Sequence, residues 1–179
     1  SASYKITPLE TAAELSNITD GNYTKVYDAQ ATNQIDASKL HITANLGGQN
    51  VDLDTTGLTG SDYQWVDASG TALTYNPKNV GTYYIKLSDT AFAKLQAQNP
   101  NFQLTSNDGL GVYTITPTTA NITFGGTNSR VYNGQGTTTA EINSNGQIKI
   151  HFTFPGSVSD ASYTLKDRDY YLVDQAGAG

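Results

Sequence analysis

The chain repeats itself at long range, and this repetition limits the folds that it can adopt. Three segments of its first half return in the same order in its second half, 4–8 at 113–117, 25–30 at 130–135 and 62–67 at 169–174. The first pair reads Tyr-Lys-Ile-Thr-Pro and Tyr-Thr-Ile-Thr-Pro. The copies are 105 to 109 residues apart, which is longer than a solenoid repeat and close to the size of an independent domain. The sequence therefore predicts one folded module that is used twice.

The two copies differ in completeness. We expect residues 1–8 to be the closing strand of a preceding module or a linker. Residues 9–117 are then a complete β-rich module with one helix near 89–99, and residues 118–179 a second, partial module.

Most predicted elements are strands. Strands are predicted at 23–27, 40–46, 63–67, 82–87 and 112–116, with counterparts of 40–46 and 63–67 at 148–154 and 170–174. Residues 9–15 alone favour a helix by propensity, but their counterpart 118–124 alternates with a period of two, so we expect both to be strands. Glycine-rich turn signals lie at 47–48 and 107–109.

One helix is predicted in the complete module. Ser88 or Asp89 can cap its start, and Asn99-Pro100 ends it. A single helix within a small mixed sheet predicts a mainly β, α+β module of the β-grasp type. An immunoglobulin-like β-sandwich is the alternative, since the partial copy shows only strands.

Composition excludes several classes of function. The formal net charge of −6 argues against nucleic acid and against an anionic membrane surface as partners. The absence of cysteine excludes disulfides and thiolate metal sites. No apolar run approaches the roughly 20 residues that span a bilayer.

The residues for catalysis are sparse, so we expect no enzymatic activity. The two histidines, His41 and His151, do not occupy matching positions in the two copies, and no nucleophile motif or phosphate loop is present. Carboxylate pairs at Asp52 with Asp54 and at Asp167 with Asp169 leave glycoside hydrolysis as a remote alternative. We expect no cofactor; the oxygen-rich segment 106–109 leaves only a weak calcium site open.

Aromatic side chains are the candidate ligand-binding residues. Exposed tyrosine and tryptophan rings offer flat amphipathic surfaces that suit weak contacts with sugars or proteins. The alternative is that most of these rings pack the core. We expect exposed rings such as those of Trp65 and Tyr84 to contribute, and the candidates are Tyr63, Trp65, Tyr75, Tyr84 and Tyr171.

The order of the motifs resembles a known family. Val-Tyr-Asp-Ala at 26–29, Asp-Tyr-x-x-Val-Asp at 62–67, the run 79–84 and the closing Tyr-x-Ile-Thr-Pro together resemble the repeated domains of Gram-positive surface adhesins. The mucus-binding repeats of lactobacilli, of the MBG or YDG type, are the nearest likeness. The resemblance implies β-rich modules of long, wall-anchored proteins that attach bacteria to mucin or host glycoprotein, and it implies no catalytic residues.

The resemblance and the composition together predict the function. We expect a non-enzymatic module of an extracellular adhesin, located at the cell surface and anchored to the wall through regions outside residues 1–179. It would bind glycans of mucin or host glycoproteins with low affinity per module, as a monomeric unit of a longer tandem array in which linked weak sites add avidity. A stalk or spacer repeat with no ligand of its own is the alternative function.

Overall fold

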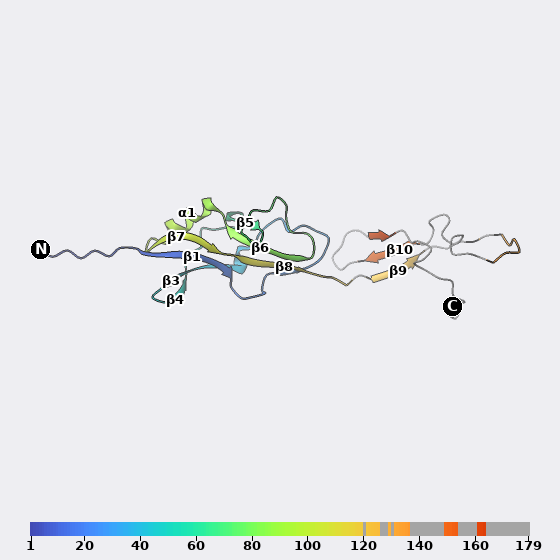
Figure 1. Cartoon of the computed structure of the whole chain (residues 1–179), viewed down its shortest axis with the longest axis horizontal. Coiled ribbons are helices and arrows are strands. Elements are labelled where there is room, and N and C mark those ends of the chain that lie inside the picture. The colour runs from blue at the N-terminus through green and yellow to red at the C-terminus, as the bar shows by residue number, and fades with distance from the viewer. Residues whose placement is uncertain (120, 126–128, 130, 137–148, 154–160, 164–179) are drawn as a thin grey trace. The chain divides into compact units, whose positions relative to one another are not determined.

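The chain consists of two compact units. The structure is a computed structural model, and it describes residues 1–119, 121–125, 129, 131–136, 149–153 and 161–163. The units are Ser1–Pro117 and Thr118–Gly179, and each is described by itself (Figure 1).

The first unit is mainly β with one helix. Its elements follow the order β1 (Leu9–Asn17), β2 (Thr24–Val26), η1 (Ala37–Lys39), β3 (Leu40–Leu46), β4 (Gln49–Asp52), η2 (Gly60–Asp62), β5 (Tyr63–Val66), β6 (Gly81–Leu87), α1 (Asp89–Gln98), β7 (Phe102–Gly109) and β8 (Gly111–Thr116). The eight strands form two mixed sheets, which confirms the predicted mainly β, α+β module. A parallel strand pair in each sheet and the helix between β6 and β7 distinguish it from an all-antiparallel immunoglobulin sandwich.

Sheet A has the strand order β4-β3-β1-β7. Strand β1 pairs antiparallel with β3, where Leu15 lies opposite Ile42, and parallel with β7. Strands β3 and β4 are joined by Gly47 and Gly48, whose φ values of 62° and 89° suit the tight turn of a hairpin. The segment 9–15 is therefore a strand, as its counterpart in the second copy predicted, because pairing on both edges outweighs helix propensity.

Sheet B has the strand order β2-β8-β6-β5. Strand β8 pairs antiparallel with β6, where Tyr83 lies opposite Tyr113, and parallel with β2. Strand β5 lies at the edge of sheet B, where it pairs with β6. This edge position leaves one side of β5 open to loops, and the loops build the site described below.

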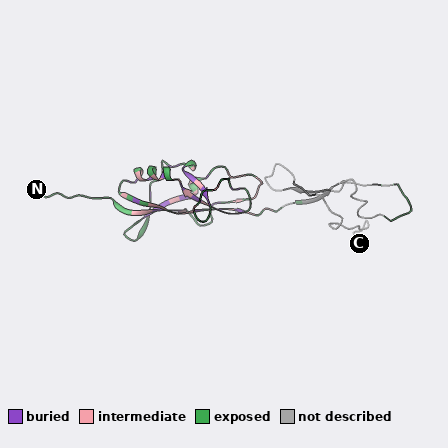
Figure 2. Cartoon of the chain, turned by 45° about the horizontal axis from the view of Figure 1, so that its top comes forward, coloured by how far each residue is buried: buried purple, intermediate pink, exposed green. Residues whose placement is uncertain are grey.

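One hydrophobic core takes side chains from both sheets and from the helix. Figure 2 marks the buried residues along the strands of the first unit. Alternate residues of the central strands point into the core, including Leu15 and Ile42 from sheet A and Ile85 and Tyr113 from sheet B. Helix α1 starts at the predicted cap, because the hydroxyl of Ser88 accepts a hydrogen bond from the backbone N–H of Ala91. Its buried residues are Ala91 and Leu95.

The chain passes from sheet A to sheet B where β7 ends. The predicted turn at 107–109 is wrong, because these residues continue β7, and β8 begins one residue after Leu110. Gly109 has a φ of 74° and lies against the backbone of Leu15. The glycine signal thus marks a close approach of two backbones and a change of sheet, where the sequence alone suggested a reversal of the chain.

A buried asparagine also connects the two sheets. The side chain of Asn17, at the end of β1, accepts a hydrogen bond from the N–H of Val112 at 2.7 Å and donates one to its carbonyl oxygen at 2.9 Å. Asn17 is mostly buried, and Val112 lies on β8. The amide side chain therefore takes the place of a strand neighbour at the point where β1 and β8 approach each other.

The second unit contains a sheet with the order β11-β10-β9, formed by β9 (Asn121–Gly125), β10 (Lys149–Thr153) and β11 (Ala161–Tyr163). Phe124 lies opposite Ile150, as Leu15 lies opposite Ile42 in sheet A. The order β11-β10-β9 thus matches β4-β3-β1 of the first unit, with the same antiparallel pairing. The strand predicted at 170–174 lies outside the described residues.

Residues 1–8 form no helix or strand and are exposed. Their assignment to a preceding module or a linker stays a prediction.

Several aspartates of the first unit make local hydrogen bonds that favour the charged carboxylate. Lys94 donates to Asp62 and lowers its pKa, and Ser69 does the same for Asp67. The pKa is lowered in the same direction at Asp28, Asp36 and Asp54. A carboxyl group with a depressed pKa in the folded state contributes stability above its unfolded pKa and loses it as the pH falls through the folded pKa.

We therefore expect the unfolding midpoint in urea to be nearly constant from pH 7 to about 5 and to fall steadily below about pH 4, where unfolded aspartate takes up protons before the folded chain does. The fluorescence of Trp65, the only tryptophan, measures this in the first unit. The variant Asp62→Asn serves as the comparison and should show a smaller acid-induced loss. A midpoint that stays constant down to about pH 2.5 would contradict the assignment.

Candidate functional site

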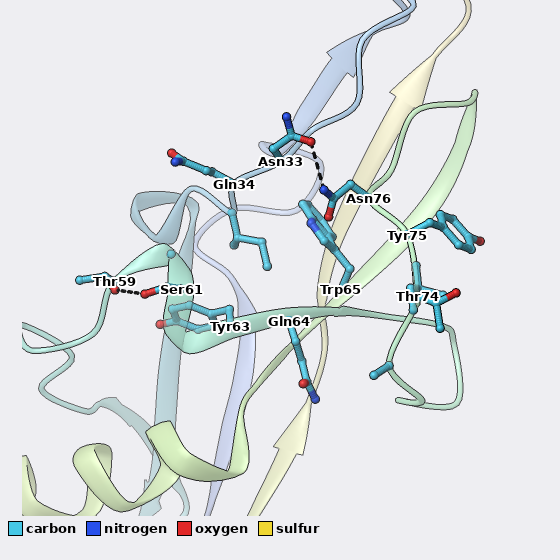
Figure 3. Close-up of a pocket in the computed structure, with 14 residues that line it drawn as sticks. Asn33, Gln34, Thr59, Ser61, Tyr63, Gln64, Trp65, Thr74, Tyr75 and Asn76 are labelled. Atoms are coloured by element: carbon cyan, nitrogen blue, oxygen red, sulfur yellow. Dashed lines mark hydrogen bonds between the residues drawn. The ribbon is translucent and has the colours of Figure 1, made fainter.

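A cleft of about 700 Å³ opens beside the edge strand β5. It is lined by residues 33–35, 59–61, 63–65 and 72–76, all in the first unit (Figure 3). Its volume lies within the range of small-molecule sites in proteins. Residues 33–35 therefore meet residues of the segment 59–76 at one edge of sheet B.

Two loops form the upper part of the cleft. The side-chain amide of Asn76 donates a hydrogen bond to the side-chain oxygen of Asn33 at 3.0 Å, and the backbone N–H of Thr32 donates to the carbonyl oxygen of Pro77 at 2.7 Å. A third contact holds the strand side, where the N–H of Leu73 donates to the carbonyl oxygen of Trp65. These bonds fix the loops 32–33 and 73–77 to each other and to β5.

Two aromatic side chains of β5 form the inner wall of the cleft. Tyr63 and Trp65 alternate with Gln64, so both rings point toward the core and are only 6% and 7% exposed. The Trp65 ring packs against Tyr113, with 5.1 Å between ring centroids, and Tyr113 in turn packs against Tyr23 at 4.7 Å. This packing holds the Trp65 ring in place beside the cleft.

The structure brings together three of the five aromatic residues that the sequence singled out. Tyr63, Trp65 and Tyr75 line the cleft, and Tyr75 is 60% exposed at its rim. The expectation of an exposed Trp65 ring is wrong, because its packing on Tyr113 buries most of the indole. Tyr84 lies on β6 and does not line the cleft, since its side chain points to the opposite face from Tyr83 and Ile85. Tyr171 lies outside the described residues.

The sequence analysis missed the polar side chains of the cleft. Amide and hydroxyl groups line it between the rings, and they come from Asn33, Gln34, Thr59, Ser61, Gln64, Thr74 and Asn76. Nothing in the local pattern distinguishes these residues from ordinary loop residues. Their grouping depends on the contact between the loops at 33 and 76, which are distant in the sequence.

Asp62, which lies in the sequence between two cleft-lining residues, forms an ion pair with Lys94. Asp62 accepts a hydrogen bond from the ammonium of Lys94 at 2.6 Å and from the backbone N–H of Thr59 at 2.8 Å. These bonds lower the pKa of Asp62 and keep it charged. Burial raises the pKa of the Tyr63 phenol, with a smaller contribution from the charge of Asp62, so Tyr63 stays neutral at physiological pH.

The other candidate residues for chemistry are separate from the cleft. His41 lies 3.0 Å from a carboxylate oxygen of Asp52, and Asp54 accepts hydrogen bonds from the backbone and hydroxyl of Thr56. Asp52 and Asp54 therefore have different hydrogen-bond partners. Asp167 and Asp169 lie outside the described residues, and only the backbone of His151, on β10, is described.

The segment 106–109, in which we expected an oxygen-rich turn, belongs to strand β7, where Ser106 donates a hydrogen bond to Asp108. In the described part of the chain, no group of three or more histidine, aspartate or glutamate residues is arranged to hold a metal ion. No helix among the described residues is long and apolar enough to cross a membrane.

Comparison with known proteins gives two matches. The family model of the MBG domain matches residues 14–117, which is more than half of the chain and includes every residue that lines the cleft. Among solved structures, a cell surface adhesin from Lactobacillus reuteri is similar, with 30% sequence identity and a TM-score of 0.44. This similarity covers 59% of the present chain and 95% of that chain. None of the curated proteins matches.

Proposed function

The chain belongs to the MBG domain family, and from this premise we propose that it is a non-enzymatic repeat module of a bacterial surface adhesin. The module binds glycans of mucin or other host glycoproteins, with low affinity for each copy. Its site is the cleft beside β5, and it acts at the cell surface within a wall-anchored tandem protein.

One observation carries this proposal: the cleft combines aromatic rings with uncharged amide and hydroxyl groups. Tyr75 presents an exposed ring at the rim, and Tyr63 and Trp65 form the inner wall. Sugars have apolar C–H faces that pack on aromatic rings and hydroxyl groups that form hydrogen bonds with amides. Pockets of this kind, largely preformed and with a few placed polar groups, are typical of small-ligand sites.

Low affinity for each module fits the use of repeated modules. The cleft is open, and a ring such as Tyr75 can supply only part of the contact surface. Linking two or more weak sites raises the overall avidity by orders of magnitude without any new contact. The proposed adhesin therefore depends on copy number for strength and on the cleft for selectivity.

The variant Tyr75→Ala tests the proposal. We expect it to reduce binding of the bead-coupled chain to immobilised mucin about tenfold, which corresponds to the loss of roughly 1.4 kcal/mol of ring contact. The urea unfolding midpoint should not change, because the ring is exposed. Binding is measured by biolayer interferometry at low and at raised salt, and it should persist at raised salt because the lining is uncharged.

The matched control is Tyr84→Ala, which removes a tyrosine of sheet B that does not line the cleft. It should bind mucin as the unsubstituted chain does. Equal loss in both variants would contradict the cleft as the site. A chain that shows no binding to mucin or to other host glycoproteins, even when coupled at high density, would support the alternative of a spacer repeat.

A further inference from the structure

We propose that the cleft beside β5 recognises uncharged sugar residues, hexoses or N-acetylhexosamines, and excludes sialic acid and sulfated sugars. This inference rests on the proposed function, since it names the class of glycan that the same site accepts. Three features of the cleft support it: the absence of charged residues, polar atoms without a partner in the described residues, and an exposed aromatic ring.

The lining of the cleft carries no charge. Of the fourteen described residues that line the cleft, none carries a formal charge at neutral pH, and burial keeps the Tyr63 phenol protonated. Recognition of a carboxylate or sulfate normally uses arginine or lysine, because a buried anion without a partner loses its hydration without compensation. The chain also carries a net charge of −6, which repels anions in general.

Two polar atoms of residues that line the cleft make no hydrogen bond within the described part of the chain. Neither the indole Nε1 of Trp65 nor the hydroxyl of Tyr63 makes a hydrogen bond to another described residue, although both side chains are more than nine-tenths buried. In the described part of the chain, the side-chain polar atoms that are both fully buried and without a partner are Gln98 Oε1 and Asn107 Oδ1. The Trp65 Nε1 and the Tyr63 hydroxyl are not among them, so both are accessible to solvent.

These two atoms suit the hydroxyl groups of a neutral sugar. The indole Nε1 can only donate, whereas the phenol can donate or accept, so together they can pair with sugar hydroxyls or with an acetamido oxygen. Because packing on Tyr113 holds Trp65 in place, little entropy is lost when a ligand binds there. The amides of Gln34 and Gln64, from two different segments, add adjustable donors and acceptors at the same cleft.

An exposed aromatic ring, that of Tyr75, lies at the rim of the cleft. Tyr75 offers a surface on which the C–H face of a sugar can pack, close to the amides of Asn33 and Asn76 that are already bonded to each other. An aromatic rim, two polar atoms and flexible neutral amides form a consistent set for an uncharged saccharide.

The main experiment compares mucin before and after enzymatic removal of sialic acid, with the full chain coupled to beads. We expect binding to be unchanged or to increase about threefold to tenfold when the terminal acid is removed, because neutral residues then become accessible. A decrease of tenfold or more after removal would overturn the proposal. Binding that survives complete chemical deglycosylation would also overturn it, since it would indicate recognition of the peptide.

A second measurement uses Trp65 itself, which is the only tryptophan and lies in the cleft wall. Galactose, N-acetylgalactosamine and N-acetylglucosamine should change its fluorescence at lower concentrations than N-acetylneuraminic acid does. This titration needs no mucin, so it tests the class of sugar separately from the adhesin function. A chain that responds to neutral sugars but does not bind mucin would count against the adhesin function alone. A stronger response to the acidic sugar, or no response to any sugar, counts against the ligand class.

Two variants refine the test. Tyr63→Phe removes only the hydroxyl and should weaken the binding of neutral sugar about threefold to tenfold, the usual value of one hydrogen bond, without lowering the urea midpoint. Its matched control, Tyr84→Phe, should leave binding unchanged. Gln34→Lys places a cation on an exposed position of the cleft and should increase the response to N-acetylneuraminic acid. Unchanged sugar binding in Tyr63→Phe would remove the assigned role of the phenol.

Discussion

Replacing Gly109 with alanine is expected to lower the free energy of unfolding by about 2–5 kcal/mol, enough to unfold a large fraction of a marginally stable module. The φ of 74° at this position is unfavourable for a residue with a Cβ atom. A Cβ atom would also overlap the backbone carbonyl oxygen of Leu15 and come within 2.8 Å of its backbone nitrogen. Because Leu15 is buried and pairs with Ile42 of β3, its backbone cannot move without disturbing this pairing.

The matched control is Gly48→Ala in the β3–β4 turn. Gly48 also has a positive φ, 89°, but no heavy atom lies within 4 Å of the position that its Cβ would take. It should therefore lose only the conformational part, about 1–2 kcal/mol. Urea unfolding followed by Trp65 fluorescence gives both values, and equal losses in the two variants would contradict the close approach of β7 to β1.

Replacing Asn17 with alanine is expected to cost about 2–4 kcal/mol, because the N–H and the carbonyl group of Val112 both lose the partner that the buried Asn17 side chain supplies. The loss should be seen as a lower urea midpoint for the first unit. It should also appear as faster hydrogen exchange at the amide of Val112, where the hydrogen bond to Asn17 is lost.

Asn22→Ala is the comparison for Asn17. Asn22 receives a single, long hydrogen bond of 3.3 Å from the Asn17 amide, so its removal should cost only a few tenths of a kcal/mol. Asn17→Asp keeps the oxygen that accepts from Val112 but loses the donor, and it should fall between the two. A stability of Asn17→Ala equal to that of Asn22→Ala would show that the two sheets do not depend on this side chain.

Much of the first unit could be predicted from the sequence. The alternation of residues 40–46 and 82–87 identified two central strands, and the hydroxyl of Ser88 identified the start of the helix. The match between 9–15 and 118–124 correctly assigned β1 as a strand against its local helix propensity. These predictions succeeded because strand alternation and helix caps are local properties, and because the repeat shows the first strand a second time.

Two strands of the first unit were not predicted. Strand β4 contains the polar residues Gln49 and Asn50 and owes its conformation to pairing with β3. Strand β7 continues through Asn107 to Gly109, residues that favour turns, because they pair with β1. In both strands the partner, and no local preference, decides the conformation.

The candidate site shows the same division. Tyr63, Trp65 and Tyr75 were singled out from the sequence as aromatic residues, and the structure brings these three to one cleft. The amides at 33–34 and 76 gave no signal, since they become neighbours only when two loops meet across the edge of sheet B.

By itself, the sequence determined the repeated mainly β module, its helix and the kind of side chain available for binding. Only the tertiary structure decided which rings are buried, which loops meet and where a glycine must allow two backbones to touch. The physical reason is that periodicity and caps act between residues near in sequence, whereas burial and clefts arise from contacts between segments distant in sequence.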